Sequence, residues 1–233
     1  MRLVDLLHHA RRVVELVDRP LQLPVEHLPV GDHDDLVEHL LVTVVEQAGQ
    51  LAGPGFTACA VRQATVFGVS PRMRLDLVVH QMLVQARSRG SIPLLGDGLQ
   101  WRPFVHVADV CEALLLLLRA DPGAVSGELF NLGGDHLNHT VRDLAEQVGN
   151  AVGVRDVHSY PGLDDRSHRM DFAKIRERPG FVPSRSVADG ARETADAISR
   201  GYVAVDDPKT MTVQWYQHLL VAAGTNSPVE MAG

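Results

Sequence analysis

GSIPLLGDGLQWRPFVHVADVCEALLLLLRADPGAVSGELFNLGG, residues 90–134, combines strand patterns, a helix pattern and glycine turns in one stretch. Ile92–Leu95 reads as an apolar strand that ends in a Gly-Asp-Gly turn, and Phe104–Val107 reads as a second β run. Asp109 is the predicted N-cap of the helix that follows. Glu128–Leu132 then forms a strand that leads into a Gly-Gly turn. Strands that alternate with a helix predict an α/β fold.

Two polar residues, Arg102 and Asn131, lie at the ends of the strand-like segments of this stretch. At such positions a polar side chain can point into a cleft while the strand itself stays packed. A guanidinium group offers a fork of donors to phosphate or carboxylate oxygens, and a carboxamide both donates and accepts hydrogen bonds. The two residues therefore predict a site for an anionic, hydrogen-bonding ligand.

The chain before this stretch reads as helices and one buried strand. Apolar residues at helical spacing predict amphipathic helices over residues 3–17 and from about Asp35 to Leu51. Phe56–Val61 is continuously apolar, the pattern of a strand buried on both faces in a parallel sheet. A further helix is predicted from about Leu75 to Arg87.

The chain after this stretch contains two helices that are predicted from their capping residues. Thr140 with Asp143 caps a helix over Val141–Val152, and Ser186 with Asp189 caps another. The other elements predicted here are a short strand around Val157–Tyr160 and a short helix that carries Trp215 and Tyr216.

Composition and charge predict a cytoplasmic protein without nucleic-acid or membrane partners. The net charge of −7 argues against nucleic-acid binding, which needs a basic surface. Cys59 and Cys111 lie inside apolar patterns, so they read as buried thiols of a reducing compartment and predict neither a disulfide nor a metal site. The longest apolar run, Ala113–Leu118, is shorter than the ~20 residues that cross a bilayer. The sequence starts without a signal-peptide pattern.

Four segments, in order along the chain, carry a resemblance to a known family. They are VRQATVFG (61–68), GDGLQWRPFVHVADV (96–110), ELFNLGG (128–134) and DRSHRMDFAKIRERPGFVPSRSVADGARET (165–194). Through them the chain, from about Asp35 to Ile198, resembles the extended short-chain dehydrogenases/reductases. These are NAD-dependent epimerases, dehydratases and reductases that act on nucleotide-diphosphate sugars.

The resemblance covers the C-terminal two-thirds of that family's pattern and implies a truncated fold. It predicts a truncated Rossmann-like sheet with a small C-terminal α+β substrate-binding portion. Residues 1–70 would be a remnant of the Rossmann-like domain, and residues 71–205 the substrate-binding portion interleaved with the last Rossmann strands. Residues 206–233 would be a C-terminal tail.

The same resemblance implies a set of ligand-binding residues. Arg102 would bind the diphosphate, and Asn131 and Arg166 would help to hold the nucleotide sugar. Arg62 and Thr65, in the VRQATVFG segment, complete the predicted set. The sequence departs from the family pattern nearby, because Pro103 replaces an acidic residue and His168 replaces an aromatic one.

The family's cofactor and proton-transfer motifs are missing from this sequence. No Gly-x-x-Gly-x-x-Gly spacing occurs, and the Gly96-x-Gly98 pair is followed by Trp101 where a third glycine would stand. At the places of the family's Tyr-x-x-x-Lys pair stand Glu38 and Val42. We therefore expect no NAD(P) cofactor and no ordinary NAD redox chemistry.

Three functions remain open at this point. The first is a nucleotide-sugar-binding pseudoenzyme or auxiliary subunit. The alternative is a cofactor-independent isomerase, lyase or cyclase in which Glu38, His106 or His168 acts as acid or base. The third is a truncated gene product without a selected activity.

An open sheet edge at Phe56–Val61 is predicted as well, because the chain supplies only the last strands of the family's sheet. Unpaired edges invite pairing with another chain. We therefore expect a homodimer, or a heteromer with a full-length homologue.

Overall fold

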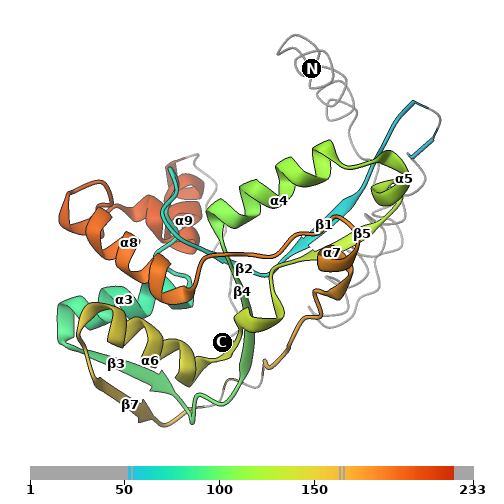
Figure 1. Ribbon diagram of the computed structural model, residues 1–233. Coiled ribbons are helices and arrows are strands. Elements are labelled where there is room, and N and C mark those ends of the chain that lie inside the picture. Colours follow the sequence, from blue (N-terminus) through green and yellow to red (C-terminus); the bar gives the residue numbers. More distant parts are fainter. Residues whose placement is uncertain (1–51, 54, 163, 165, 223–233) are drawn as a thin grey trace, which may run out of the picture. The chain divides into compact units, whose positions relative to one another are not determined.

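The computed structural model describes residues 52, 53, 55–162, 164 and 166–222 (Figure 1). All of them belong to one structural unit, residues 47–233. The helices predicted over residues 3–17 and 35–51, and with them the candidate Glu38, lie outside the described residues. The domain boundaries proposed from the sequence stay predictions.

Strands and helices alternate along the described chain (Figure 1). The strands are β1 (Ala60–Gln63), β2 (Thr65–Phe67), β3 (Ser91–Leu95), β4 (Trp101–His106), β5 (Leu129–Leu132), β6 (Asn138–Thr140) and β7 (Asp156–Tyr160). The helices are α3 (Val78–Arg89), α4 (Val107–Arg119), α5 (Pro122–Val125), α6 (Val141–Val152), α7 (Ala173–Glu177), α8 (Val187–Ser199) and α9 (Thr212–Ala222). Two short 3₁₀ turns are η2 (Asp135–Leu137) and η3 (Pro208–Thr210).

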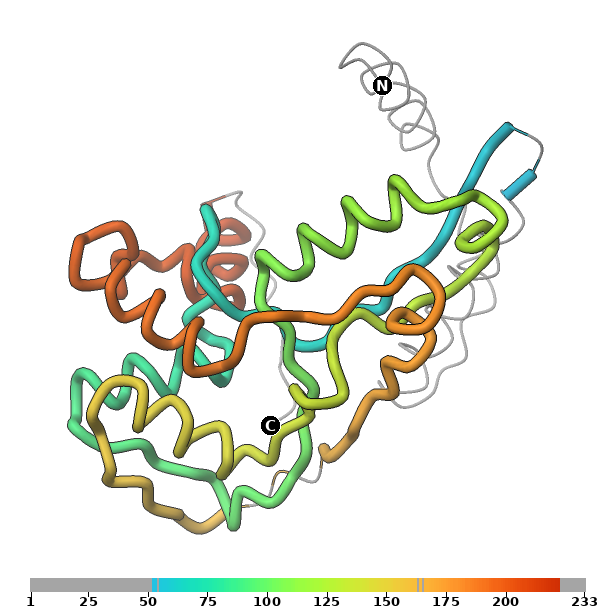
Figure 2. Tube along the Cα trace, viewed as in Figure 1, coloured from blue at the N-terminus to red at the C-terminus, as the bar shows by residue number. Residues whose placement is uncertain are grey.

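Most strand pairs in the described residues are parallel, which confirms the α/β fold. β1 pairs with β5, β2 with β4 and β3 with β7, all in parallel, and β6 joins the other edge of β4 in antiparallel orientation. Figure 2 traces the chain as it passes from β1 directly into β2. Parallel partners need a crossover connection, and the one from β2 to its partner β4 contains the helix α3.

Two clusters of buried side chains hold these elements together. One lies among α3, α6, α8 and β3, and includes Leu83, Phe104 and Leu144. The other lies among α4, α7 and β5, and includes Phe130 and Phe172. Each of these five side chains is almost fully buried, and burial of one such side chain contributes about 1.5–3 kcal/mol.

Both helix caps predicted after residue 134 are confirmed, and each has the form of a capping box. The Thr140 hydroxyl accepts the backbone N–H of Asp143 at 3.1 Å at the start of α6, which spans Val141–Val152 as predicted. Ser186 and Asp189 form the same reciprocal arrangement at α8. Hydrogen bonds from the Ser186 side chain and backbone lower the pKa of Asp189 to about 2.

The start of α4 differs from the prediction. The helix begins at Val107, and its N-cap is His106, whose Nδ1 accepts the backbone N–H of Ala108 at 3.2 Å. Asp109 lies inside the first turn, fully buried, and its carboxylate accepts hydrogen bonds from the side chain and backbone N–H of Arg185. A buried carboxylate needs such a partner, so Asp109 joins α4 to the segment before α8 instead of capping the helix.

Other expectations about the N-terminal half need correction. The predicted strand Phe56–Val61 is β1, which begins at Ala60 and is half-buried to exposed, since within the described residues β5 is its partner on one side only. The helix expected from Leu75 begins at Val78, because Leu75 is taken up in a small cluster with Met73 and Val203. Of the two thiols, Cys59 is half-buried and Cys111 is exposed.

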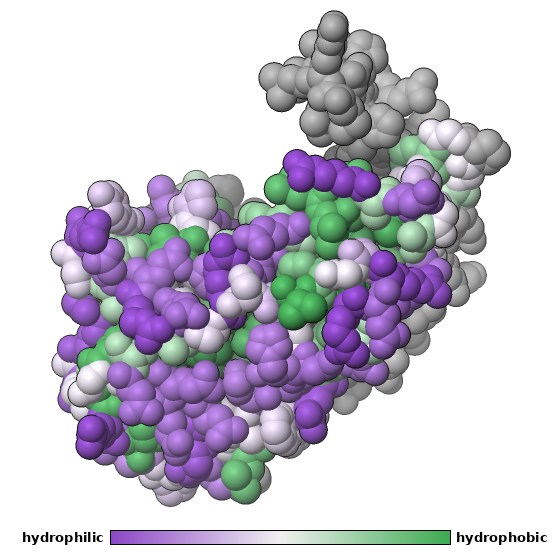
Figure 3. Space-filling view, viewed as in Figure 1, coloured by the Kyte–Doolittle hydropathy of each residue, from purple (hydrophilic) through white to green (hydrophobic). Residues whose placement is uncertain are grey.

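Helix α4 is apolar on two sides. Val110, Ala113 and Leu117 are buried against the core, whereas Leu115 and Leu118 are 49% and 75% exposed. Figure 3 shows hydrophobic surface where α4 lies. No helix among the described residues is both long enough and apolar enough to span a membrane.

Candidate functional site

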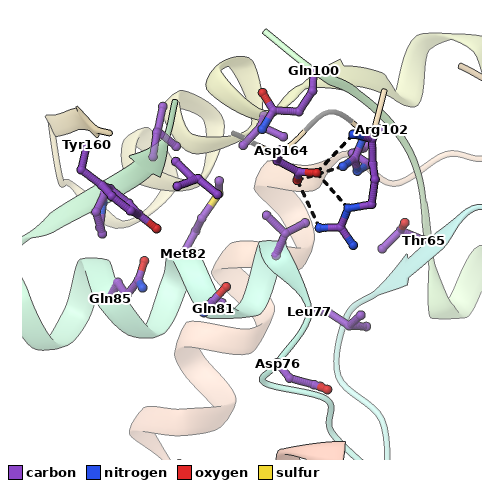
Figure 4. Close-up of a pocket in the computed structure, with 16 residues that line it drawn as sticks. Thr65, Asp76, Leu77, Gln81, Met82, Gln85, Gln100, Arg102, Tyr160 and Asp164 are labelled. Carbon is purple, nitrogen blue, oxygen red and sulfur yellow. Dashed lines mark hydrogen bonds and ion pairs between the residues drawn. The ribbon is translucent and has the colours of Figure 1, made fainter. Parts of the chain in front are cut away.

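A cavity of about 420 Å³, which we call the Arg102 pocket, lies between α3, the strands β3 and β4, and the segment after β7 (Figure 4). Its volume falls in the range of roughly 300–1,000 Å³ that is usual for small-molecule sites. Thr65 of β2 and Arg102 of β4 reach it from neighbouring strands, and Asp164 and Arg166 reach it from the segment after β7. Strands and helix therefore form fixed walls around a polar group of side chains.

Arg102 contributes the partly buried positive charge of this pocket. Its side chain is 14% exposed, and its Nη1 donates to the carbonyl oxygen of Trp101 at 3.0 Å. Its Nη2 donates to Oδ2 of Asp164 at 3.0 Å (Figure 4). The prediction placed Arg102 at a strand end, and the structure places it near the start of β4, opposite His139 of β6.

Asp164 bridges Arg102 to a second arginine. Arg166 donates from Nε to Oδ1 of Asp164 at 2.8 Å and from Nη2 to Oδ2 at 3.2 Å. The hydrogen bonds from Arg166, aided by the charge of Arg102, hold the pKa of Asp164 below its usual value. The carboxylate is therefore ionised at neutral pH, and the three side chains together carry one net positive charge.

The rest of the pocket offers neutral hydrogen-bonding groups and apolar surface. Gln81 and Gln85 lie one turn apart on α3, and Gln100 and Tyr160 add further polar groups (Figure 4). The apolar part comes from Leu77, Val78, Met82, Pro93, Leu94, Leu95 and Val141. Carboxamides can pair with hydroxyl groups and with nucleobase edges, and the apolar side chains can cover a flat ring. Sequence reasoning missed these residues, although the spacing of Gln81 and Gln85 on a predicted helix was a usable signal.

Arg62 and Asn131, which were expected beside Arg102, meet each other at another place. They are register partners of β1 and β5, and Nε of Arg62 donates to Oδ1 of Asn131 at 2.8 Å. The amide of Asn131 also donates to the backbone oxygen of Asp171 at 2.9 Å. Of the predicted ligand-binding residues, Thr65, Arg102 and Arg166 line the Arg102 pocket, and Arg62 and Asn131 do not.

The two histidine candidates also lie apart from the lining of this pocket. His106 is buried, caps α4, and places its Nε2 2.7 Å from Oε2 of Glu193 in α8. His168 is exposed, and its backbone N–H donates to the oxygen of Trp101 at 3.1 Å. Partial desolvation and the positive charge of Arg102 lower the pKa of His168. The contacts of His106 are those of a residue that joins β4, α4 and α8.

The described residues contain no group of three or more His, Cys, Asp or Glu side chains with the geometry of a metal site.

The chain has sequence relatives among enzymes of nucleotide sugars. Residues 36–133 match the model of the NAD dependent epimerase/dehydratase family. The chain is 37% identical over 111 residues to a dTDP-glucose 4,6-dehydratase of Streptomyces niveus, and this covers 46% of the chain and 32% of the relative. It is 33% identical over 106 residues to a UDP-glucose 4-epimerase of Mycolicibacterium smegmatis, covering 44% and 33%. The chain thus spans about a third of the length of these relatives.

Solved structures show the same fold. The dTDP-glucose 4,6-dehydratase of Streptomyces venezuelae, solved with NAD bound, superposes with a TM-score of 0.55 at 25% identity, covering 72% of this chain and 50% of that one. The UDP-glucose 4-epimerase of Thermotoga maritima, solved with UDP-glucose, has a TM-score of 0.57 at 24% identity, covering 72% and 54%.

Parallel strands joined by helices, with an arginine-lined cavity beside them, define the class of protein. It has the Rossmann-like fold of the short-chain dehydrogenases/reductases, of which the chain matches only part. Within that fold, residues 36–133 match the model of the NAD dependent epimerase/dehydratase family, and the sequence relatives named above carry dehydratase and epimerase names. The resemblance carried by the four sequence segments is thereby confirmed.

The family implies a dinucleotide, which in Rossmann folds sits on a glycine-rich turn between a strand and a helix. In the part of the chain that the structure describes, β4 runs directly into α4 and β6 runs directly into α6. Their N-termini are capped by the side chains of His106 and Thr140, and their first turns carry Asp109 and Asp143. A carboxylate in the first turn opposes a phosphate at that place. These junctions do not fit a dinucleotide.

Proposed function

We propose that this chain binds a nucleoside-diphosphate sugar in the Arg102 pocket and acts as a pseudoenzyme or auxiliary subunit, without NAD(P). The observation that carries the proposal is the meeting of two arginines in one cavity of small-molecule size. Arg102 is partly buried, and Arg166, two residues after Asp164, pairs with the same carboxylate as Arg102 does. Guanidinium forks match phosphate oxygens in charge and shape.

The neutral walls of the pocket support the same ligand class. The carboxamides of Gln81, Gln85 and Gln100 can bind sugar hydroxyls or a nucleobase edge, while Leu94 and Leu95 offer apolar contact. The relatives named above act, by their names, on dTDP-glucose and UDP-glucose. A nucleoside diphosphate joined to a sugar has the matching parts: a flat base, two phosphates and several hydroxyl groups.

The described lining residues include no histidine, and both of their aspartates have lowered pKa values, which favours a binding role over catalysis. Burial opposes ionisation of the lining residue Asp76, but hydrogen bonds from Arg74 outweigh it and lower the pKa of Asp76. Asp164 is likewise held ionised. A cofactor-independent isomerase, lyase or cyclase would need a residue that exchanges protons near neutral pH.

A binding partner is part of the proposal, because two surfaces of this unit suit another chain. β1 has an open edge within the described residues, and α4 exposes Leu115 and Leu118. Open strand edges and exposed apolar stripes are usual places of association. We therefore expect a homodimer, or a heteromer with a full-length homologue.

Thermal unfolding in the presence of ligands tests the binding role. UDP-glucose and dTDP-glucose should raise the melting temperature of the chain, since a ligand that binds the folded state adds roughly 2.7 kcal/mol at 100 times its dissociation constant. NAD and NADP should leave it unchanged. The shift should vanish in Arg102→Ala and persist in the control Arg200→Ala, which removes an exposed arginine that pairs within α8 and its C-cap. A shift with NAD, or a shift kept in Arg102→Ala, contradicts the proposal.

A further inference from the structure

One carboxylate, that of Asp164, pairs with both arginines of the Arg102 pocket. Arg102 comes from β4, and Asp164 lies 62 residues further along the chain. Figure 4 shows the side chain of Asp164 directed at Arg102, with dashed lines marking the contacts. The cavity therefore contains an anion of its own at the point where its positive charge is concentrated.

The bonding of Asp164 resembles the way in which an arginine pair holds a phosphate. Oδ1 accepts from Nε of Arg166 at 2.8 Å, and Oδ2 accepts from Nη2 of Arg166 at 3.2 Å and from Nη2 of Arg102 at 3.0 Å. Both oxygens are in use, and the fork of Arg166 is engaged on both of its sides. Carboxylate and phosphate oxygens compete for such donors, because each binds a guanidinium through charge-assisted hydrogen bonds.

Burial makes this competition strong. The side chains of Arg102 and Asp164 are 14% and 16% exposed, so water screens their attraction less than it does at the surface. A ligand without negative charge cannot replace the carboxylate, since it would leave Arg102 without its partner. A monophosphate offers fewer oxygens to the two arginines than a diphosphate does.

We propose that Asp164 is an internal counter-anion, which a nucleoside diphosphate must displace from Arg102 and Arg166 in order to bind. Asp164 then lowers the affinity of the pocket for every anionic ligand and selects diphosphates over monophosphates. This inference rests on the proposed function for the place of binding. It goes beyond it by naming the residue that sets affinity and selectivity.

Calorimetric titration of the full chain with UDP-glucose and with UMP tests the role of Asp164. Asp164→Asn keeps the shape of the side chain and removes its charge, so UDP-glucose should bind about tenfold more tightly than to the unchanged chain. The affinity for UMP should rise by a larger factor, so the ratio of the affinities for UDP-glucose and UMP becomes smaller. Asp164→Ala should raise both affinities as well. Asp206→Asn, a change of the same charge at an exposed aspartate, should leave both affinities as they are.

The outcomes separate this inference from the proposed function. If UDP-glucose binds the unchanged chain and binds both Asp164 variants equally or less tightly, Asp164 positions the arginines instead, and the counter-anion role is wrong. If no variant with melting temperature near that of the unchanged chain binds either nucleotide, the pocket is not a nucleotide site and both proposals fail. Binding that is detectable only in the Asp164 variants supports the counter-anion role but contradicts the proposed function, which requires that the unchanged chain binds.

Discussion

Gly68 lies against the imidazole ring of His106, so closely that a Cβ atom built on Gly68 would come within 2.5 Å of Nε2 of His106. His106 cannot give way easily, because it is buried, caps α4 and contacts Glu193 of α8. Gly68 itself has a φ of +104° and donates its N–H to Nε2 of His80 at 3.1 Å. The turn after β2 is therefore fitted to two histidines, one from β4 and one from α3.

Gly68→Ala should therefore be strongly destabilising. The added methyl group meets His106 and the backbone is strained, so we expect a loss of roughly 2–4 kcal/mol in the free energy of unfolding. Gly90→Ala is the matched control, since Gly90 also has positive φ, +69°, but no atom within 4 Å of a built Cβ. It should cost about 1 kcal/mol. Urea denaturation measures both, and equal costs would show that His106 does not confine Gly68.

The stability of the chain should fall between about pH 7.5 and about pH 5.5. Burial lowers the pKa of His80 in the folded state, whereas the unfolded chain takes up a proton near pH 6.5. The unfolded state then binds more protons, so acidification favours unfolding. The pKa values of His139 and His168 are lowered too, so these residues also make the folded state less stable on acidification.

His80→Gln should reduce this pH dependence. A glutamine can still accept from Gly68 and donate to the oxygen of Arg74, as His80 does, but it does not titrate. Urea denaturation at both pH values gives the two free energies for each chain. The same loss of stability on acidification in His80→Gln as in the unchanged chain would show that the pKa of His80 does not differ between the folded and the unfolded state.

Self-association should depend on the outer edge of β1. The N–H groups of Ala60 and Ala64 donate to the oxygens of Glu128 and Leu132, so the period of two directs the N–H of Gln63 away from β5. Gln63→Pro removes that outward donor without breaking a bond to β5. Light scattering should show a dimer of the unchanged chain at low micromolar concentration and a monomer of Gln63→Pro. A monomer in both cases, with no copurifying homologue, contradicts the proposed association.

Local patterns in the sequence predicted the helix caps well, because the interacting groups lie three residues apart. Thr140 with Asp143, and Ser186 with Asp189, cap their helices as expected. The cap of α4 was missed because the contact that decides it joins residues far apart in the sequence. Asp109 looks like a capping residue, but its partner Arg185 lies 76 residues away and draws it into the first turn.

The candidate site was predictable only where the family motifs reach it. Arg102 and Arg166, taken from two motifs far apart, do meet in one pocket. Arg62 and Asn131 come from equally good motifs and pair with each other instead, because β1 and β5 set them in register. The contact between Arg102 and Asp164 had no local signal, since it depends on how the segment after β7 folds back over β4.

The most direct test of the central claim is a crystal structure of the chain with dTDP-glucose. The account predicts electron density for the diphosphate within hydrogen-bond distance of the Arg102 guanidinium, with Asp164 displaced from it and the glutamines of the pocket turned to the ligand. Density for the ligand away from Arg102, or for a nicotinamide dinucleotide bound to this chain, would contradict it.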